Sequence, residues 1–161
     1  MKPVPVLQAL VLADRIYQDN ATGKKIIAGT FSGFKFSKKP AIAEIVRPDG
    51  QKQRVMMGGT SVGSPYAYIS LTDVCEGTTV QIQFVSLSKN IVLFGNAVTI
   101  SNADRLSNVE VILPLPMLPI SEAGIYALQV VCEGQILGSW RVVAEDMDAK
   151  KEGQSDDPRP A

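Results

Sequence analysis

Two runs near the C-terminus alternate between apolar and polar positions and flank a Glu-Gly turn. The first run begins at Ala127 and ends at Cys132, the turn is Glu133-Gly134, and the second run extends to Ala144. Alternate side chains of a strand point to opposite faces of a sheet, so one set is expected inward and the other outward. The pattern predicts a β-hairpin over 127–144.

The same alternation recurs along most of the chain, between turns rich in Gly, Pro, Asn and Asp. The other runs predicted as strands are Leu7–Tyr17, Lys24–Phe36, the short Ala41–Val46, Tyr66–Val74, Thr78–Leu87, Ile91–Ile100 and Val109–Leu113. Gln51–Met57 is expected to be an edge strand or an irregular excursion. Lys38-Lys39-Pro40 is expected to end the second of these strands, because proline cannot donate to a ladder. The nearly continuous apolar run 91–100 indicates a strand covered on both faces. Eight or nine short strands without a helical period predict an all-β, antiparallel two-sheet sandwich.

Three residues just before the predicted hairpin suggest which kind of sandwich this is. They are Glu122, Gly124 and Tyr126. In immunoglobulin-type sandwiches, a tyrosine near the start of the penultimate strand hydrogen-bonds backwards to the backbone and locks a corner. We therefore predict an immunoglobulin-like sandwich with a structural corner at these residues. An ordinary core tyrosine beside a turn is the alternative.

Both ends of the chain resemble a family of bacterial proteins. The matching stretches are Ala9–Tyr17, Thr22-Gly23-Lys24, Ala28–Phe31 and Gly124-Ile125-Tyr126 before the Glu-Gly hairpin. They are similar to an uncharacterised bacterial family known as a domain of unknown function, although Ala13 stands where many members have cysteine. The resemblance implies β architecture, and it implies no activity because none is assigned to the family.

Length and composition indicate one globular domain. The chain has 161 residues, of which 45% are hydrophobic and 20% charged, and this is enough for a full core. We expect a single β-sandwich domain over residues 1–146. The remainder, 147–161, offers almost nothing apolar to bury and is expected to be a disordered tail.

Charge and cysteine content narrow the possible partners. The chain has 16 basic and 16 acidic residues and no histidine. A nucleic-acid partner is therefore not expected, because it requires a basic surface, and the commonest general base is missing. Cys75 and Cys132 are interpreted as buried free thiols. No segment approaches transmembrane length, so we expect a cytoplasmic protein without a membrane partner.

A proline-rich apolar run before the corner is the best candidate for a contact surface. Leu113, Leu115, Met117 and Leu118 are interleaved with three prolines between 113 and 120, which exclude a central strand. Exposed apolar patches often bind other proteins. The alternative is a connection that tucks its leucines under the sandwich.

The sequence gives little support for a catalytic or metal centre. Ser86 and Lys89 match a Ser-x-x-Lys pattern, but that pattern requires a helix, and here it falls at a predicted turn. Calcium would require clustered aspartates, and the candidates are scattered singly: Asp14, Asp19, Asp49, Asp73 and Asp104. We expect neither catalytic residues nor a cofactor.

These patterns together favour a non-catalytic binding or assembly module. Its partner would be another protein or a copy of itself, reached through an apolar surface or an open sheet edge. The alternative is a ligand-binding domain of the C2-like or carbohydrate-binding kind.

Overall fold

All regular structure in this chain is β. The computed structural model describes residues 3–59, 64–101 and 104–148, with the backbone alone at 38–43 and 55–59. Within these residues there is no helix, which confirms the all-β prediction. The ten strands of the described residues are β1 (Val6–Gln18), β2 (Lys25–Thr30), β3 (Gly33–Val46), β4 (Lys52–Gly59), β5 (Tyr66–Thr72), β6 (Thr78–Ser86), β7 (Ile91–Ile100), β8 (Val109–Pro114), β9 (Gly124–Cys132) and β10 (Gln135–Asp146).

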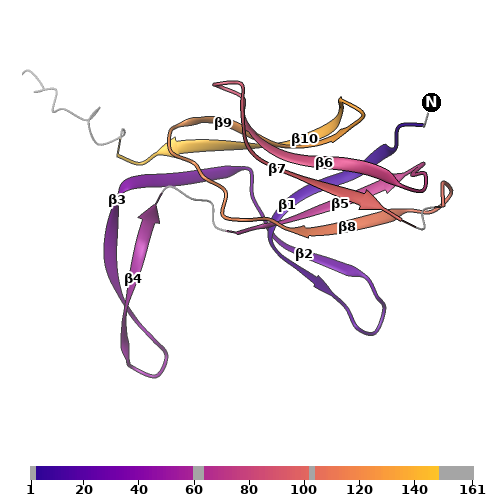
Figure 1. Cartoon of the computed structure of the whole chain (residues 1–161). Coiled ribbons are helices and arrows are strands. Elements are labelled where there is room, and N and C mark those ends of the chain that lie inside the picture. Colours follow the sequence, from indigo (N-terminus) through magenta and orange to yellow (C-terminus); the bar gives the residue numbers. More distant parts are fainter. Residues whose placement is uncertain (1–2, 60–63, 102–103, 149–161) are drawn as a thin grey trace, which may run out of the picture.

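The strands form two sheets that lie as two layers in Figure 1. The four-stranded sheet has the order β2-β1-β5-β8, and the six-stranded sheet has the order β4-β3-β10-β9-β6-β7. Alternation places one set of side chains from each sheet between the layers. Leu12 and Ile69 of the smaller sheet and Ile82, Leu128 and Val142 of the larger one are fully buried there in one core. The arrangement is therefore sandwich-like.

The run predicted as one strand over Lys24–Phe36 is two strands in different sheets. Gly29 has a φ of +74°, which side-chain-bearing residues rarely adopt, and the chain leaves β2 directly after it. The two residues that cross between the layers are held by β10. Trp140 Nε1 donates to the carbonyl oxygen of Phe31 over 2.8 Å, and the Val143 amide donates to that of Ser32 over 2.9 Å.

This crossing also produces the one pair of strands that departs from the predicted antiparallel plan. After it, β3 runs beside β10 in parallel, with Gly33 opposite Val143 and Phe36 opposite Asp146. The other strand pairs of the described residues are antiparallel. Only two residues cross between the sheets, so the chain does not reverse its direction there. β3 therefore enters the larger sheet running in the same direction as β10.

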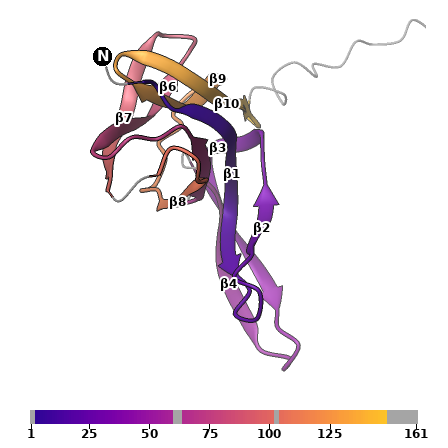
Figure 2. The same cartoon turned by 90° about the vertical axis from the view of Figure 1, so that its right-hand side faces the viewer.

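Lys38-Lys39-Pro40 does not end a strand, contrary to the prediction. β3 continues through it to Val46, and between the pairs Ser37–Gly59 and Ala41–Met57 it advances four residues while β4 advances two. This irregularity provides a place for a proline, which has no N–H for the ladder. The hairpin of β3 and β4 and the far end of the hairpin of β1 and β2 both extend beyond the two layers in both views (Figures 1 and 2).

Most side chains of β7 are exposed or only half-buried, so the prediction that both of its faces are covered is wrong. β7 pairs with β6 on one side and ends the six-stranded sheet on the other. Ile91 and Val92 are about half exposed, at 48% and 59%. The pattern misleads because an apolar run shows that a strand can bury its side chains. It does not show whether other parts of the chain cover them.

The C-terminal hairpin forms as predicted. Glu133 and Gly134 have φ values of +50° and +75°, as a two-residue type I′ turn requires. Both cysteines are free thiols, but Cys132 is buried whereas Cys75 is only half-buried. Burial raises the pKa of Cys132. Trp140 is partly buried against the core.

β10 ends at the predicted domain boundary, but the chain stays attached slightly beyond it. The amide of Met147 donates to the carbonyl oxygen of Phe36 over 2.9 Å, so this residue extends the contact between β10 and β3. The rest of the predicted tail, from 149 to 161, lies outside the described residues.

One buried hydroxyl leads to a prediction about stability. Thr78 is 6% exposed, and its Oγ1 has no hydrogen-bond partner among the described residues. Burying a hydroxyl without a partner costs about 1–3 kcal/mol. Thr78→Val should therefore raise the free energy of unfolding by about 1 kcal/mol in urea denaturation.

Thr79→Val is the matched control. Its hydroxyl is solvent-exposed and hydrogen-bonded to that of Thr99 over 2.9 Å, so this substitution should give no gain. Equal stabilisation by both substitutions would show that β propensity, and not the buried hydroxyl, accounts for the change.

Candidate protein-binding face

Four strands of the larger sheet present a second set of side chains on the side away from the core. On β6, Val80, Ile82 and Phe84 are buried in the core, so the residues between them point outwards. The registers with β7, β9 and β10 identify the side chains beside them. We call this set the outer face: Thr79, Gln81, Gln83, Val85, Val92, Gly95, Ala97, Thr99, Ile125, Ala127, Gln129, Val131, Ile136, Ser139, Arg141 and Val143.

The middle of the outer face is closely packed although the described residues form no third layer over it. Val85, Ala127 and Val131 are at most 8% exposed, yet they do not belong to the core between the sheets. They are instead covered by neighbouring side chains of the same face. The larger sheet therefore carries a thin apolar layer of its own on its outer side.

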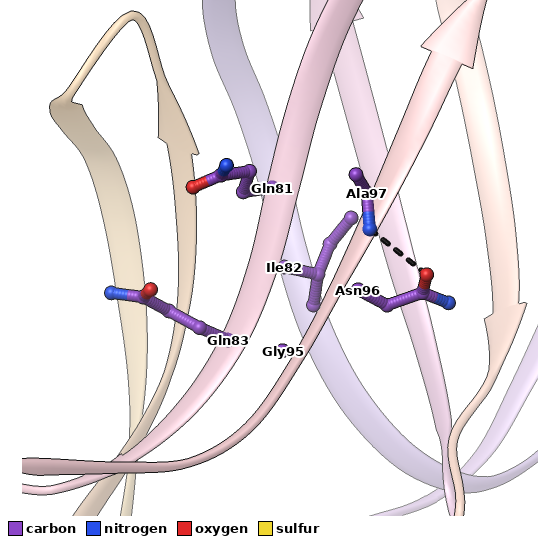
Figure 3. Close-up of a pocket in the computed structure, with 6 residues that line it drawn as sticks. All are labelled: Gln81, Ile82, Gln83, Gly95, Asn96 and Ala97. Carbon is purple, nitrogen blue, oxygen red and sulfur yellow. Dashed lines mark hydrogen bonds between the residues drawn. The ribbon is translucent and has the colours of Figure 1, made fainter.

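Three glutamine side chains lie over this layer. Gln83 Nε2 donates to Gln129 Oε1 over 2.9 Å, from β6 to the neighbouring β9. Figure 3 shows that Gln81 and Gln83 project to the same side of β6. An amide both donates and accepts hydrogen bonds and carries no charge, so these side chains can pair with polar backbone groups at little desolvation cost.

Small side chains on β7 leave hollows beside the glutamines. One hollow of about 280 Å³ is lined by Gln81, Gln83, Gly95 and Ala97, among others. A second, of about 230 Å³, lies around Val131 and the hairpin turn. A third of about the same volume lies between Gln83 and Ile136. All three are small beside typical ligand pockets of about 300–1,000 Å³, and they suit single side chains of a partner better than a ligand.

Exposed apolar side chains surround this centre. Five residues on or beside the outer face are exposed by 40% or more although they are large and apolar: Leu87, Val92, Ile125, Ile136 and Val143. Single exposed apolar residues are ordinary, but a contiguous group marks contact surfaces. The group here comes from three strands, β7, β9 and β10, and from the turn after β6.

Charge is almost missing from the outer face. No residue of β6, β7 or β9 is charged, whereas about one residue in five of the whole chain is. β10 contributes Arg141, and Glu145 near its C-terminal end. Desolvating this face would therefore leave few uncompensated charges, which is the composition found at the centre of protein interfaces.

The proline-rich run predicted as a contact surface is mostly part of the core. Leu115 and Leu118 are at most 3% exposed, and Leu113 packs against the core from β8. Of the four predicted residues only Met117 is exposed, at 66%. The connection between β8 and β9 therefore tucks its leucines under the sheets, and the surface prediction is wrong for them. Prolines prevent strand pairing but do not prevent the side chains between them from turning inwards.

The predicted corner residues lie together at the start of β9. The hydroxyl of Tyr126 donates to the carbonyl oxygen of Glu122 over 2.8 Å, which is the backward bond expected of a corner tyrosine. Its ring stacks on Phe84 with centroids 5.6 Å apart. Burial raises the pKa of Tyr126, so its hydroxyl stays protonated and able to donate.

The Ser-x-x-Lys residues are used by the same corner. Ser86 Oγ accepts a hydrogen bond from the Lys89 amide over 3.3 Å, which closes the turn, and Ser88 Oγ accepts one from the Ile125 amide over 3.1 Å. Lys89 Nζ lies 2.6 Å from Glu122 Oε1. This hydrogen bond raises the pKa of Lys89, whereas a lysine base must be neutral. The turn therefore accounts for all three side chains.

The five aspartates considered for calcium lie apart: Asp14 is within β1, and the other four belong to separate turns and loops. Asp19 accepts from the Ala21 amide and the Thr22 hydroxyl, and these bonds lower its pKa. Asp49 and Asp104 each accept an amide two residues ahead. Asp73 lies 3.7 Å from Arg105. Among the described residues, no three Asp, Glu, Cys or His side chains are grouped closely enough to hold a metal ion.

No protein-family model and no curated protein matches this chain. The resemblance of its two ends to a domain of unknown function therefore stays a prediction. In the part of the chain that the structure describes, no helix has the length and apolarity to cross a bilayer.

Proposed function

We propose that this chain is a non-catalytic binding module that contacts another protein through the outer face. The observation that carries the proposal is the combination on one surface of exposed apolar side chains and neutral amides with almost no charge. Two ion pairs lie away from this surface, at Lys52–Glu44 on the β3–β4 hairpin and at Arg105–Asp73 between loops, and the Lys89–Glu122 pair lies at its border, in the corner. A surface kept free of charge over three adjacent strands is suited to burial against a partner.

We also propose that the sandwich is immunoglobulin-like. β1, β5 and β8 correspond in order to strands A, B and E of that fold, and β10, β9, β6 and β7 correspond to G, F, C and C′. Tyr126 then lies near the start of strand F at the E–F corner, where its backward hydrogen bond is expected. The hairpin partners β2 and β4 are additions to this plan.

The proposal includes a location in the cytoplasm, with no nucleic-acid or membrane partner. Two free thiols suit a reducing compartment. Equal numbers of basic and acidic residues do not favour binding to a polyanion.

Capture of partners by two matched variants tests the proposed function. Ile136 on the outer face is 54% exposed, and Ile26 on β2 is 51% exposed in the other sheet. Ile136→Glu places an uncompensated charge in the proposed interface, whereas Ile26→Glu places the same charge outside it. Tagged wild-type protein and both variants are used as baits in lysate of the host cell.

We expect at least one protein to bind wild type and Ile26→Glu equally and to lose about tenfold or more in affinity for Ile136→Glu, the effect of a buried unpaired charge. Affinities are measured by titrating the purified partner. Equal affinity for both variants, or the lack of any saturable partner, would contradict the proposal.

A further inference from the structure

The free edge of β7 carries neither a charged side chain nor a proline to prevent strand pairing. Sheet edges are commonly protected by charged side chains or proline. The other three outer strands follow this rule, with Lys25 on β2, Lys52 on β4, and Glu110 and Pro114 on β8. β7 has ten residues without a charge or a proline. Its sequence suits a central strand, yet on one side it has no neighbour among the described residues.

One irregularity on β7 lies at its beginning and leaves the rest regular. The register shifts between the pairs Phe84–Phe94 and Val85–Val92, so Leu93 is an extra residue. From Phe94 to Ile100 the pairing with β6 proceeds residue by residue. These seven residues have Ala97 at their centre.

The backbone of Ala97 points to the free edge. Its amide donates to the side-chain Oδ1 of the preceding Asn96 over 2.9 Å, and Figure 3 shows this contact on the side of β7 away from β6. In an antiparallel pair, alternate residues bond to one neighbour and the residues between them face the other. Gly95, Ala97 and Thr99 therefore present N–H and C=O groups outwards, and the Asn96 side chain accepts the hydrogen bond of the central amide.

We propose that β7 pairs antiparallel with β7 of a second copy of this chain, about a two-fold axis at Ala97. This inference goes beyond the proposed function, since it uses the free edge of β7 and leaves the outer face uncovered. In this register Ala97 faces Ala97 of the copy, Gly95 faces Thr99, and Asn96 faces Val98. The two six-stranded sheets become one continuous sheet, and the two outer faces become one surface.

The lack of charge on β7 favours a second copy of this chain as the strand that pairs with its free edge. Two-fold antiparallel pairing places the central residue directly opposite itself, so an edge strand with charges near its centre repels its own copy. β7 has none, and the outward side chains at 95, 97 and 99 are small enough for two strands to approach on the outer face. Each outward residue can exchange both of its backbone hydrogen bonds with the residue opposite, and the Asn96 side chain is then released from the Ala97 amide.

Charge substitutions at the two-fold axis test the proposal. Ala97 is solvent-exposed, so a longer side chain is accommodated in the single chain. Ala97→Lys and Ala97→Glu each place two like charges opposite one another, and Ala97→Gln adds the same bulk without charge. Masses of the purified full chain and of each variant are measured by light scattering after size exclusion, across a wide range of protein concentration.

We expect dimers for wild type and Ala97→Gln, and a rise of about tenfold or more in the dissociation constant for each charged variant. An equimolar mixture of the Lys and Glu variants should form a heterodimer, because opposite charges then meet. In wild type, the amides of Gly95, Ala97 and Thr99 should exchange with deuterium more slowly as the concentration rises.

A wild-type chain that stays monomeric, or charged variants that dimerise as well as wild type, would overturn the pairing. Dimerisation without slower exchange at these three amides would also overturn it, because the contact would then lie elsewhere. A monomeric chain that still captures a protein through Ile136 would refute only self-pairing and leave the proposed function intact. A β7 dimer whose outer face captures no protein would refute the proposed function and leave self-pairing intact.

Discussion

Leu118→Ala should lower the free energy of unfolding by about 3 kcal/mol, within the range of about 2–5 kcal/mol for leucine truncation in a core. Leu118 is fully buried in the core between the sheets, although it stands in a connection between prolines. Removing its side chain leaves a cavity that prolines on both sides make difficult to close, because their fixed φ limits how far the connection can move. The change is measured by urea unfolding followed through Trp140 fluorescence.

Met117→Ala is the matched control for this prediction. Its side chain is 66% exposed in the neighbouring position, so its truncation should change stability by less than about 0.5 kcal/mol. Equal effects of the two substitutions would contradict the division of the proline-rich run into buried leucines and an exposed methionine.

Gly124→Ala should lower the free energy of unfolding by about 3 kcal/mol, through backbone strain and a steric contact. The backbone at Gly124 has a φ of +156°, which residues with a Cβ rarely adopt and which costs them about 1–3 kcal/mol. A Cβ there would also lie 2.8 Å from Ser88 Oγ. That oxygen cannot move away freely, since it accepts the hydrogen bond of the Ile125 amide. Urea unfolding of the variant measures the sum of both effects.

A double-mutant cycle with Ser88→Ala separates the two sources. Removing Oγ relieves the contact while the backbone strain remains, so Gly124→Ala should cost about 1 kcal/mol less in that background. Additive effects would show that the hydroxyl is not what excludes a side chain at Gly124. An unchanged stability of the single variant would contradict the corner geometry as a whole.

Alternation along the sequence predicted most strands of the described residues, because each strand buries one face. The Glu-Gly hairpin is the clearest case, since Glu133 and Gly134 both take the positive φ that a type I′ turn needs. The corner residues were also found from sequence, because a tyrosine beside a glycine and an acidic residue is a local signal. Such signals depend on neighbours along the chain, which the sequence displays directly.

The neighbours of each strand were not predictable in the same way. Alternation assigns a side chain to a face but does not name the adjacent strand, so 91–100 was expected to be covered and lies at an edge. The crossing at Phe31-Ser32 depends on hydrogen bonds from β10, more than a hundred residues later. Leu115 and Leu118 turn inwards because two sheets leave room there, and their own sequence does not show this.

The outer face was missed although the sequence contained a usable signal. Alternation within 78–87 assigns Gln81 and Gln83 to the face opposite Val80 and Ile82, but outward glutamines are common on strands. The informative feature is the lack of any charge in β6, β7 and β9. Only the pairing of β6 with both β7 and β9 shows that these three uncharged segments form one surface.

Site-specific photo-crosslinking in living host cells tests the outer face most directly. A photoreactive amino acid replaces Gln81 at the centre of the outer face in one protein, and Ile26 on β2 in the control. The account predicts a covalent adduct of defined higher mass from position 81 and no such adduct from position 26. Adducts from both positions alike, or from position 26 alone, would show that the outer face is not the contact surface.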